Sequence, residues 1–445
     1  MNGDLTKCNG GLDIMLSKIK NWAWYKKLIL FLSVMGPGII VMMADNDAGG
    51  ISTYAVTGSK YGFSLLWIFL LLFPIAYYVQ EMTIRLGAVT KRGHAEAIFD
   101  AFGSFWGWFS LIDLSIVNWL TLVTEYIGMI AAMTIFGIPP IVTYIFVTTV
   151  LFSIVWYGKY WTFEKITLFF CVFNLVYIPV TFWAMDAPNA PGWSSVFEGF
   201  YNITGCGKFT QDLIFIIMAN IGTTIAPWML FFQQSAVVDK KIDIKDVYNA
   251  KLETLIGSFL TCFIAVFIII ATGAAFYFRV PQIIIQDAKQ TADVLVTLLP
   301  HHGNLARHLF AIGLFDAGFL GAICISLSSS WAVGEVFGWS HSLDHKLKEA
   351  PHFYLIYLTM LLTSGAVVLI PHAPLVMITM FVQVTAVTLL PSSLVFLILL
   401  LNDKSLMGTY VNTLTQNIIN WSIIIFIIIM SSIMGFQTLF PGFFK

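Results

Sequence analysis

Long apolar stretches separated by short polar loops occupy most of the chain, from residue 28 to residue 437. A helix needs about 17–25 predominantly apolar residues to cross a bilayer. Eleven stretches meet that requirement and predict an all-α, polytopic membrane protein with about eleven transmembrane helices. The predicted spans cover residues 28–58, 62–89, 104–135, 138–157, 163–185, 210–238, 248–277, 303–332, 353–370, 374–401 and 415–437.

Polar residues interrupt the first stretch where a membrane helix should be most apolar. Asp45, Asn46 and Asp47 follow one another there, and glycines occupy positions 49 and 50. A charged side chain at the bilayer centre costs about 2.5–3.5 kcal/mol, and adjacent glycines weaken a helix. We therefore expect a break over residues 45–50 that turns carbonyls and carboxylates toward an ion or substrate.

The sixth stretch carries a second interruption, the sequence Gly-Thr-Thr-Ile-Ala-Pro-Trp from Gly222 to Trp228. Pro227 alone would indicate an ordinary kink, because proline removes one helical hydrogen bond. Its position five spans after the first break instead favours two inverted five-helix repeats with a binding site at the midplane. The repeats are predicted over about 28–185 and 210–401, with an extra span over about 415–437.

The composition agrees with a membrane protein and excludes several other classes. Only 11% of the 445 residues are charged, against about 25% in soluble proteins. The net charge of −1 provides no field that would attract nucleic acid. The five scattered cysteines indicate neither a disulfide framework nor a metal motif. Nucleotide-binding loops and the motifs of zinc proteases and serine hydrolases are absent from the sequence, so we expect neither an enzyme nor a cofactor.

Loop charges predict the orientation in the membrane. Lysine and arginine concentrate in residues 1–27 and in alternate loops, which is the positive-inside pattern. We expect a cytoplasmic arm over residues 1–27, one transport domain over 28–445, and a multi-pass cell-membrane protein with its C-terminus outside. The long outer loop over about 186–209 is predicted to be irregular. Its sequon at Asn202 is interpreted as a chance match.

Short motifs in the same order and spacing resemble the Nramp family of divalent metal transporters, which have the LeuT-type fold. The resemblance covers most of the chain. It is carried by Gly36-Pro37-Gly38, Asp47-Ala48-Gly49-Gly50, Ser59-Lys60-Tyr61-Gly62, Glu125-Tyr126-Ile127-Gly128, Ala226-Pro227-Trp228 and Gln383. It implies a transporter of a divalent cation that works in the lipid bilayer as a monomer.

The resemblance also implies a set of ion ligands, and this chain departs from it. The family holds its ion with an Asp and an Asn of the first break, a Met of the second, and one backbone carbonyl from each. Here Asp47 keeps the carboxylate, while Gly50 replaces the Asn and Ala226 replaces the Met. The carbonyls would be those of Ala44 and Thr223. The two smaller residues predict a roomier site.

Other residues near the breaks have more than one interpretation. Asp45 adds a carboxylate that is either a ligand, an acceptor beside the ion, or a charge in the aqueous vestibule. Gln383 either reaches the ion and its water or satisfies backbone groups freed by the breaks. Thr223 and Thr224 offer carbonyls and hydroxyls near the second break. Asn46 is a weaker candidate, and Trp228 is expected to form a wall of the pathway.

Ligand chemistry predicts which ion is carried. Sulfur ligands favour transition metals, whereas oxygen ligands and water suit Mg²⁺, which keeps part of its hydration shell. Without the family's Met, the site is similar to that of the Nramp-related magnesium transporters. We predict transport of partly hydrated Mg²⁺ by alternating access, with Mn²⁺ tolerated. The alternatives are a proton-coupled Mn²⁺/Fe²⁺ symporter, an ion-binding enzyme or sensor, and an organic-solute transporter of the same fold.

The proton-carrying groups of the family are replaced. Trp228, Gln233 and Leu122 stand where the family has two His and an Asp, and none of them titrates near neutral pH. We therefore expect movement driven by the ion's own gradient and the membrane potential. Glu125 remains as a proton carrier, a vestibule charge or a partner of a helix end.

Three further intramembrane features have structural interpretations. Glu81 and Arg85 lie four residues apart and are expected to pair on one helix. Asp113 and Asp316 lie in the third and eighth spans, remote in sequence from the breaks.

Overall fold

Helices and connecting loops make up the described part of the chain. The computed structural model describes residues 36–157, 159–207, 210–279, 288–299, 302–370 and 374–439, and these ranges contain no strand. The predicted N-terminal arm over 1–27 and the start of the first span lie outside them. The predicted all-helical fold is therefore confirmed over the described ranges.

Both predicted interruptions are present as helix breaks. The first span consists of α3 (Pro37–Ala44) and α4 (Ala48–Tyr61), and the sixth of α12 (Gln211–Thr224) and α13 (Pro227–Asp239). The first break covers residues 45–47, so the expectation that it extends to residue 50 is wrong. Gly49 and Gly50 belong to the first turn of α4 instead.

The other helices occupy the remaining predicted spans and parts of the connections between them. They are α5 (Trp67–Thr90), α6 (His94–Phe102), α7 (Ser104–Ile135), α8 (Pro140–Trp156), α9 (Tyr160–Cys171), α10 (Tyr177–Asp186), α11 (Trp193–Tyr201), α14 (Val247–Thr272), α15 (Ala288–Leu298), α16 (Gly303–Phe337), α17 (Pro351–Val367), α18 (Leu375–Asn402), α19 (Lys404–Met407) and α20 (Leu414–Leu439). The 3-10 turns are η1 (Phe173–Val176), η2 (Ile203–Cys206), η3 (Ile244–Asp246) and η5 (Gly408–Tyr410), and the π-turn η4 (Gly273–Tyr277) extends α14.

Helices α6, α11, α15 and α19 lie in segments that were predicted as connections between spans. The outer loop predicted to be irregular contains α11 and η2, so that prediction is wrong for Trp193–Cys206. Exposed aromatic residues such as Phe197 and Tyr201 lie on α11, which gives it an apolar face that loop composition did not reveal. The fifth span is interrupted by η1, which separates α9 from α10.

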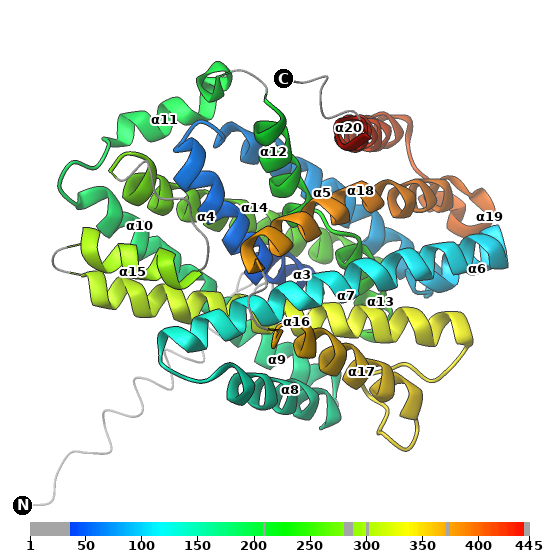
Figure 1. The fold of residues 1–445 in the computed structure, drawn as a ribbon. Helices are drawn as coiled ribbons and strands as arrows, with labels where there is room; N and C mark the ends of the chain where they lie inside the picture. Colours follow the sequence, from blue (N-terminus) through cyan, green and yellow to red (C-terminus); the bar gives the residue numbers. More distant parts are fainter. Residues whose placement is uncertain are drawn as a thin grey trace, which may run out of the picture.

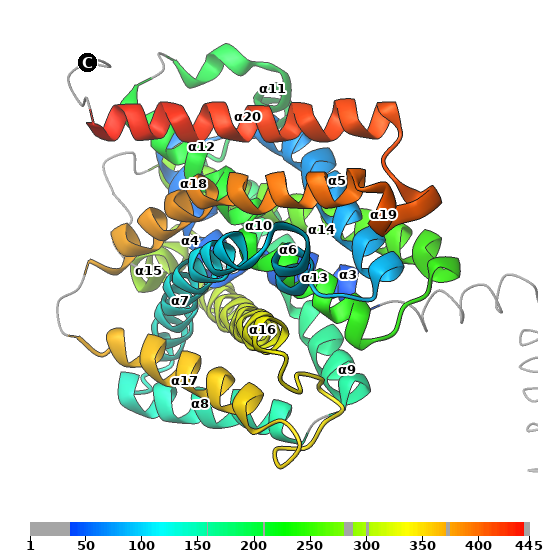
Figure 2. The same ribbon diagram turned by 90° about the vertical axis from the view of Figure 1, so that its right-hand side faces the viewer.

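The broken helices occupy the interior of the bundle. Figure 1 shows α3 and α4 at the centre, with α7 and α16 passing beside them. In Figure 2, α8 and α17 lie together on one side, while α20 runs along α18 on the other. All residues from 40 to 51 and from 216 to 237 are buried, so the irregular backbone at both breaks is enclosed by protein, as a membrane requires.

Eight described segments are long and apolar enough to cross a membrane, with α9 to α10 and α12 to α13 each taken as one. Two shorter apolar helices, α8 and α17, and the two halves of the first span complete the pattern. The count of eleven spans, the repeat boundaries, the orientation and the monomeric state remain predictions.

A glycine sets the distance between α12 and α18. A Cβ atom added at Gly222 would lie 2.0 Å from the backbone oxygen of Gln383, closer than any real contact. Gly222→Ala is therefore expected to destabilise the folded protein by about 2–3 kcal/mol, since overpacking that meets backbone cannot relax by a rotamer change. Unfolding in mixed micelles measures this. Gly435→Ala on α20, where an added Cβ has no atom within 4 Å, is the control and should match the parent protein.

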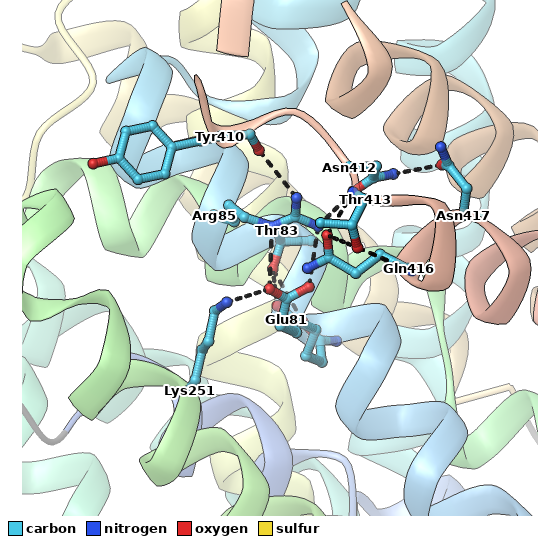
Figure 3. Close-up of polar contacts among 10 residues, drawn as sticks. Glu81, Thr83, Arg85, Lys251, Tyr410, Asn412, Thr413, Gln416 and Asn417 are labelled. Carbon is cyan, nitrogen blue, oxygen red and sulfur yellow. Dashed lines mark hydrogen bonds and ion pairs between the residues drawn. The ribbon is translucent and has the colours of Figure 1, made fainter. Parts of the chain in front are cut away.

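The predicted Glu81–Arg85 pair is confirmed and belongs to a larger network (Figure 3). Arg85 Nε and Nη2 donate to the Glu81 carboxylate over 3.1 and 3.3 Å, and Lys251 Nζ on α14 lies 2.6 Å from Glu81 Oε1. Arg85 also donates to the Tyr410 carbonyl and to Asn412 Oδ1, over 3.1 and 2.6 Å. The network thus joins α5 and α14 to the segment that leads into α20.

Candidate functional site

Local chemistry explains where each half-helix ends. Pro227 disfavours helical backbone at the residue before it, and Ile225 and Ala226 are both extended. Asp47 is also extended, with φ −71° and ψ 174°, and its Oδ1 accepts a hydrogen bond from Gly50 N over 2.6 Å. The aspartate therefore caps the N-terminus of α4.

Glu125 on α7 supplies a second cap for the same helix. Its Oε2 accepts a hydrogen bond from Ala48 N over 3.0 Å, so the partnership of Glu125 with a helix end is confirmed. A Cβ added at Gly321 of α16 would lie 2.9 Å from Glu125 Oε2 and 3.1 Å from Asp47 Cβ. The two carboxylate side chains therefore meet beside the same turn of α16.

The breaks leave the two expected carbonyls without helical partners. In a continuous helix the Ala44 carbonyl would accept from Ala48 N, but that group donates to Glu125. The Thr223 carbonyl would accept from residue 227, which is proline and has no N–H. These are the two carbonyls predicted to face the ion, and each is freed by one identifiable residue.

The two broken helices meet at Gly50. A Cβ built there would lie 2.7 Å from Thr223 Oγ1 and 3.3 Å from both Asp47 Oδ1 and the Asp45 carbonyl oxygen. The Thr223 hydroxyl therefore lies where an asparagine side chain would begin, while the size of the whole site stays a prediction. Three oxygens from the two broken spans converge there, and one of them is the Thr223 hydroxyl.

Unpartnered polar atoms gather at the breaks. Both carboxylate oxygens of Asp45, Asn46 Oδ1, Thr223 Oγ1 and Gln383 Nε2 are buried and have no hydrogen-bond partner. Such groups cost about 1–3 kcal/mol each when left unsatisfied, so a cluster of them indicates a polar ligand. Asn46 is partly engaged, because its Nδ2 donates to the Thr261 carbonyl on α14 over 3.3 Å.

Gln383 lies between the two broken helices. Its backbone oxygen contacts Gly222 of α12, and a Cβ added at Gly49 of α4 would lie 2.1 Å from its Nε2. Its predicted place beside the breaks is therefore observed. Thr224 is different, because its hydroxyl donates to the Asn220 carbonyl over 2.9 Å and lies 3.4 Å from the Tyr54 hydroxyl. Its assignment to the ion site stays a prediction.

The second break contains a sulfur atom that sequence reasoning missed. Ala226 N donates to Met229 Sδ over 3.4 Å, so the thioether caps the first turn of α13. Its position three residues after the break, where capping groups reach back, was the available signal. Trp228 is buried and its carbonyl accepts a hydrogen bond from Ser328 Oγ over 3.1 Å, which suits the expected wall of the pathway.

The intramembrane residues that were expected to have structural roles form hydrogen bonds with neighbouring side chains. Ser392 Oγ donates to Asp113 Oδ2 over 2.6 Å, and Asn174 Nδ2 donates to Asp316 Oδ2 over 3.3 Å. Gln233 donates to Thr254 Oγ1 over 3.0 Å. Across the ranges that the structure describes, no three His, Cys, Asp or Glu side chains form a conventional metal cluster. A cation at the breaks would instead be held by carbonyls, carboxylates and a hydroxyl.

Comparison with known proteins agrees with this geometry. Residues 38–437 match the family model described as natural resistance-associated macrophage protein-like. The divalent metal cation transporter MntH of Listeria monocytogenes serotype 4a (strain HCC23) is 26% identical over 437 residues, covering 94% of this chain and 92% of the relative.

Solved structures share the fold. The manganese transporter of Eremococcus coleocola, in complex with an aromatic bis-isothiourea substituted compound, has a TM-score of 0.75 at 19% identity, covering 95% of this chain and 89% of its own. MhsT in complex with L-phenylalanine has a TM-score of 0.64 at 13% identity, covering 90% and 98%. At these identities the likeness concerns the fold, which is of the LeuT type. The chain belongs to the natural resistance-associated macrophage protein-like family, whose members are metal-ion transporters and not enzymes.

Proposed function

We propose that this protein carries partly hydrated Mg²⁺ across the cell membrane by alternating access and that it tolerates Mn²⁺. The observation that carries the proposal is the convergence of oxygens at Gly50, where the Asp45 carbonyl, Asp47 Oδ1 and Thr223 Oγ1 lie around one point. The freed carbonyls of Ala44 and Thr223 add to this set. Oxygen ligands of this kind suit Mg²⁺ and Mn²⁺.

The charge of the site favours a divalent cation. Asp45 and Asp47 are both buried, and among the described residues neither forms a salt bridge. A buried carboxylate without a compensating positive charge is very unfavourable, and one divalent ion neutralises two of them. An organic solute with its own carboxylate would be repelled, which argues against the organic-solute transporter.

The sulfur chemistry favours Mg²⁺ over softer metals. Ala226 stands at the position of the family's Met, and the nearby Met229 thioether is engaged in capping α13. The curated relative is named as a divalent metal cation transporter and a solved structure as a manganese transporter, which supports Mn²⁺ as a tolerated ion. A proton-coupled Mn²⁺/Fe²⁺ symporter is therefore the competing function.

The replacement of the family's two His and one Asp by Trp228, Gln233 and Leu122 supports uncoupled transport. Gln233 donates a hydrogen bond to Thr254 and accepts one from Thr83 Oγ1 over 3.3 Å. Gln233 therefore forms part of the packing between helices. Glu125, the remaining candidate proton carrier, is engaged by Ala48 N. The ion would then move down its own gradient and the membrane potential, which supplies about 2.3 kcal/mol per charge per 100 mV.

Flux in proteoliposomes tests this function. Mg²⁺ uptake should proceed with Mn²⁺ as a weaker competitor, without a change of lumenal pH. A strong preference for Cd²⁺ over Mg²⁺ would contradict the magnesium assignment, and acidification of the lumen during uptake would contradict uncoupled transport. Protein-free liposomes and a competing-ion series at constant ionic strength are the controls.

Ala226→Met is expected to raise the ratio of Cd²⁺ to Mg²⁺ affinity about tenfold, because a thioether at this extended position adds a soft ligand. Competition by Cd²⁺ against Mg²⁺ uptake measures the ratio. Ala226→Leu is the matched control, since it adds similar volume without sulfur and should change both affinities together. An unchanged ratio in the Met variant would argue against Ala226 as a residue that faces the ion.

A further inference from the structure

A second buried carboxylate lies away from the two breaks. Asp316 is on α16 and is 2% exposed, and no salt bridge to it occurs among the described residues. Asp316 lies on a different face of α16 from the residues that contact the first site. Gly318 and Gly321 contact α7 and Asp47, whereas Gly313, one turn before Asp316, contacts Tyr177 of α10. At 100° per residue, these two pairs of positions point to different sides of the helix.

The interruption of the fifth span faces Asp316. Asn174 lies in η1, between α9 and α10, and its Nδ2 donates to Asp316 Oδ2 over 3.3 Å. In this segment the backbone hydrogen bonds join residues three apart instead of four. Leu175 N, for example, donates to the Val172 carbonyl over 3.1 Å. A 3-10 stretch within a helix often marks a functional position.

Three polar atoms in this cluster have no partner. They are Asp316 Oδ1, Asn174 Oδ1 and the Tyr177 hydroxyl, and all three residues are at most 2% exposed. A Cβ added at Gly313 would lie 2.8 Å from the Tyr177 hydroxyl, which places that oxygen on the same side of α16 as Asp316. The unpartnered atoms are therefore oxygens of three chemical types, contributed by α16, η1 and α10.

Three other acidic residues of the spans, Glu81, Glu164 and Asp113, are compensated differently. Glu81 has Arg85 and Lys251 as counter-charges, and Glu164 on α9 has Lys240 Nζ at 2.5 Å. Asp113 is less buried, and its carboxylate accepts a hydrogen bond from the Ser392 hydroxyl. Asp316 has only the long amide bond of Asn174. An ionised carboxylate in such surroundings needs one positive charge.

We propose that Asp316, Asn174 and Tyr177 bind a monovalent hard cation of the Na⁺ class between α16 and the interrupted fifth span. The single carboxylate sets the charge of the ion at one. Because the ligands are carboxylate, amide and phenol oxygens, they favour a hard cation. The site holds the fifth span against α16 and is separate from the oxygens at Gly50.

Thermal unfolding of the full chain in detergent, without divalent ions, tests the site. Replacing choline chloride by NaCl at constant ionic strength should raise the apparent Tm by about 2 °C for each tenfold increase in Na⁺ above its Kd. Binding of ²²Na⁺ to the same sample should saturate at one ion per chain. Both measurements are independent of transport, so they can fail or succeed separately from the proposed function.

Variants assign the effect to this cluster. Asp316→Asn should abolish the Na⁺ response and ²²Na⁺ binding, and Tyr177→Phe, which removes only an unpartnered oxygen, should weaken both at least about threefold. The controls are Asp113→Asn and Tyr126→Phe, whose side chains are hydrogen-bonded elsewhere, and both should respond to Na⁺ like the parent.

Three results would overturn the proposal. These are equal stability of the parent protein in Na⁺ and choline, a full Na⁺ response in Asp316→Asn, and stabilisation of the parent by acid alone without ²²Na⁺ binding. The last result would mean that Asp316 holds a proton instead of a metal cation.

Discussion

Replacing Asp47 with asparagine is expected to lower Mg²⁺ flux by about 100-fold or more while leaving the protein folded. Loss of partners that merely orient metal ligands costs 10–100-fold, so loss of a carboxylate ligand should cost at least the upper end. The carboxylate oxygen of Asp47 lies where the two broken helices meet at Gly50, and the side chain is buried.

The asparagine variant separates the two roles of this residue. Asp47 Oδ1 also caps α4 through Gly50 N, and asparagine is as good a capping residue as aspartate. Asp47→Asn should therefore keep the cap and lose the charge. Asp47→Ala loses both and should unfold more easily by about 0.5–2 kcal/mol.

Flux and stability are measured on the same preparations. Radiotracer or dye uptake of Mg²⁺ gives the flux, and thermal unfolding gives the stability of each variant. Parent-like uptake by Asp47→Asn would remove this residue from the ion site. If Asp47→Asn took up little Mg²⁺ and unfolded while Asp47→Ala stayed folded, the assignment of the cap would be contradicted.

Arg85→Ala is expected to destabilise the protein by about 3 kcal/mol, because each hydrogen bond from a buried charged donor contributes about 1.5–3 kcal/mol and only Lys251 remains beside Glu81. Glu81 and Arg85 are both about 6% exposed. Lys251 stays close to Glu81 but is itself more exposed, and it cannot replace the bonds of Arg85 to Tyr410 and Asn412 (Figure 3). The connection to α20 should loosen as well.

Unfolding in mixed micelles measures this change, and a double variant isolates the charge. Glu81→Gln combined with Arg85→Ala should be less destabilised than the sum of the two single variants, since the two side chains bond directly to each other. Arg92→Ala is the matched control, because Arg92 forms ion pairs that are about half exposed. Surface pairs contribute about 0–1 kcal/mol. Equal effects of Arg85→Ala and Arg92→Ala would contradict the importance of burial.

Much of the fold was predictable because apolar length and helix-breaking residues act locally. Pro227 ends α12 wherever α12 lies, and the carboxylates of Asp45 and Asp47 interrupt the first span, although its second half-helix begins earlier than the glycines suggested. The pairing of Glu81 with Arg85 follows from four-residue spacing on one helix. The helix α11 was missed because its apolar face is short and lies in a segment rich in proline and glycine.

The contacts between distant segments could not be predicted in the same way. Glu125 caps α4 from 77 residues away, and Gln383 reaches Gly49 from another helix. Thr223 fills the space at Gly50, while its neighbour Thr224 turns back to Asn220. The sequence predicted similar chemistry for the two threonines. Only their positions on α12 give their hydroxyls different contacts.

The sequence by itself determined that the chain is a helical membrane protein with two broken spans, since hydrophobic length, carboxylates and proline act on their own segments. It also determined which carbonyl the second break frees, because Pro227 has no N–H to offer Thr223. The tertiary structure alone decided which oxygens meet and which stay unpartnered. Those properties depend on how α4, α12, α16 and α18 approach one another, and close packing across glycines such as Gly50 and Gly222 sets these distances.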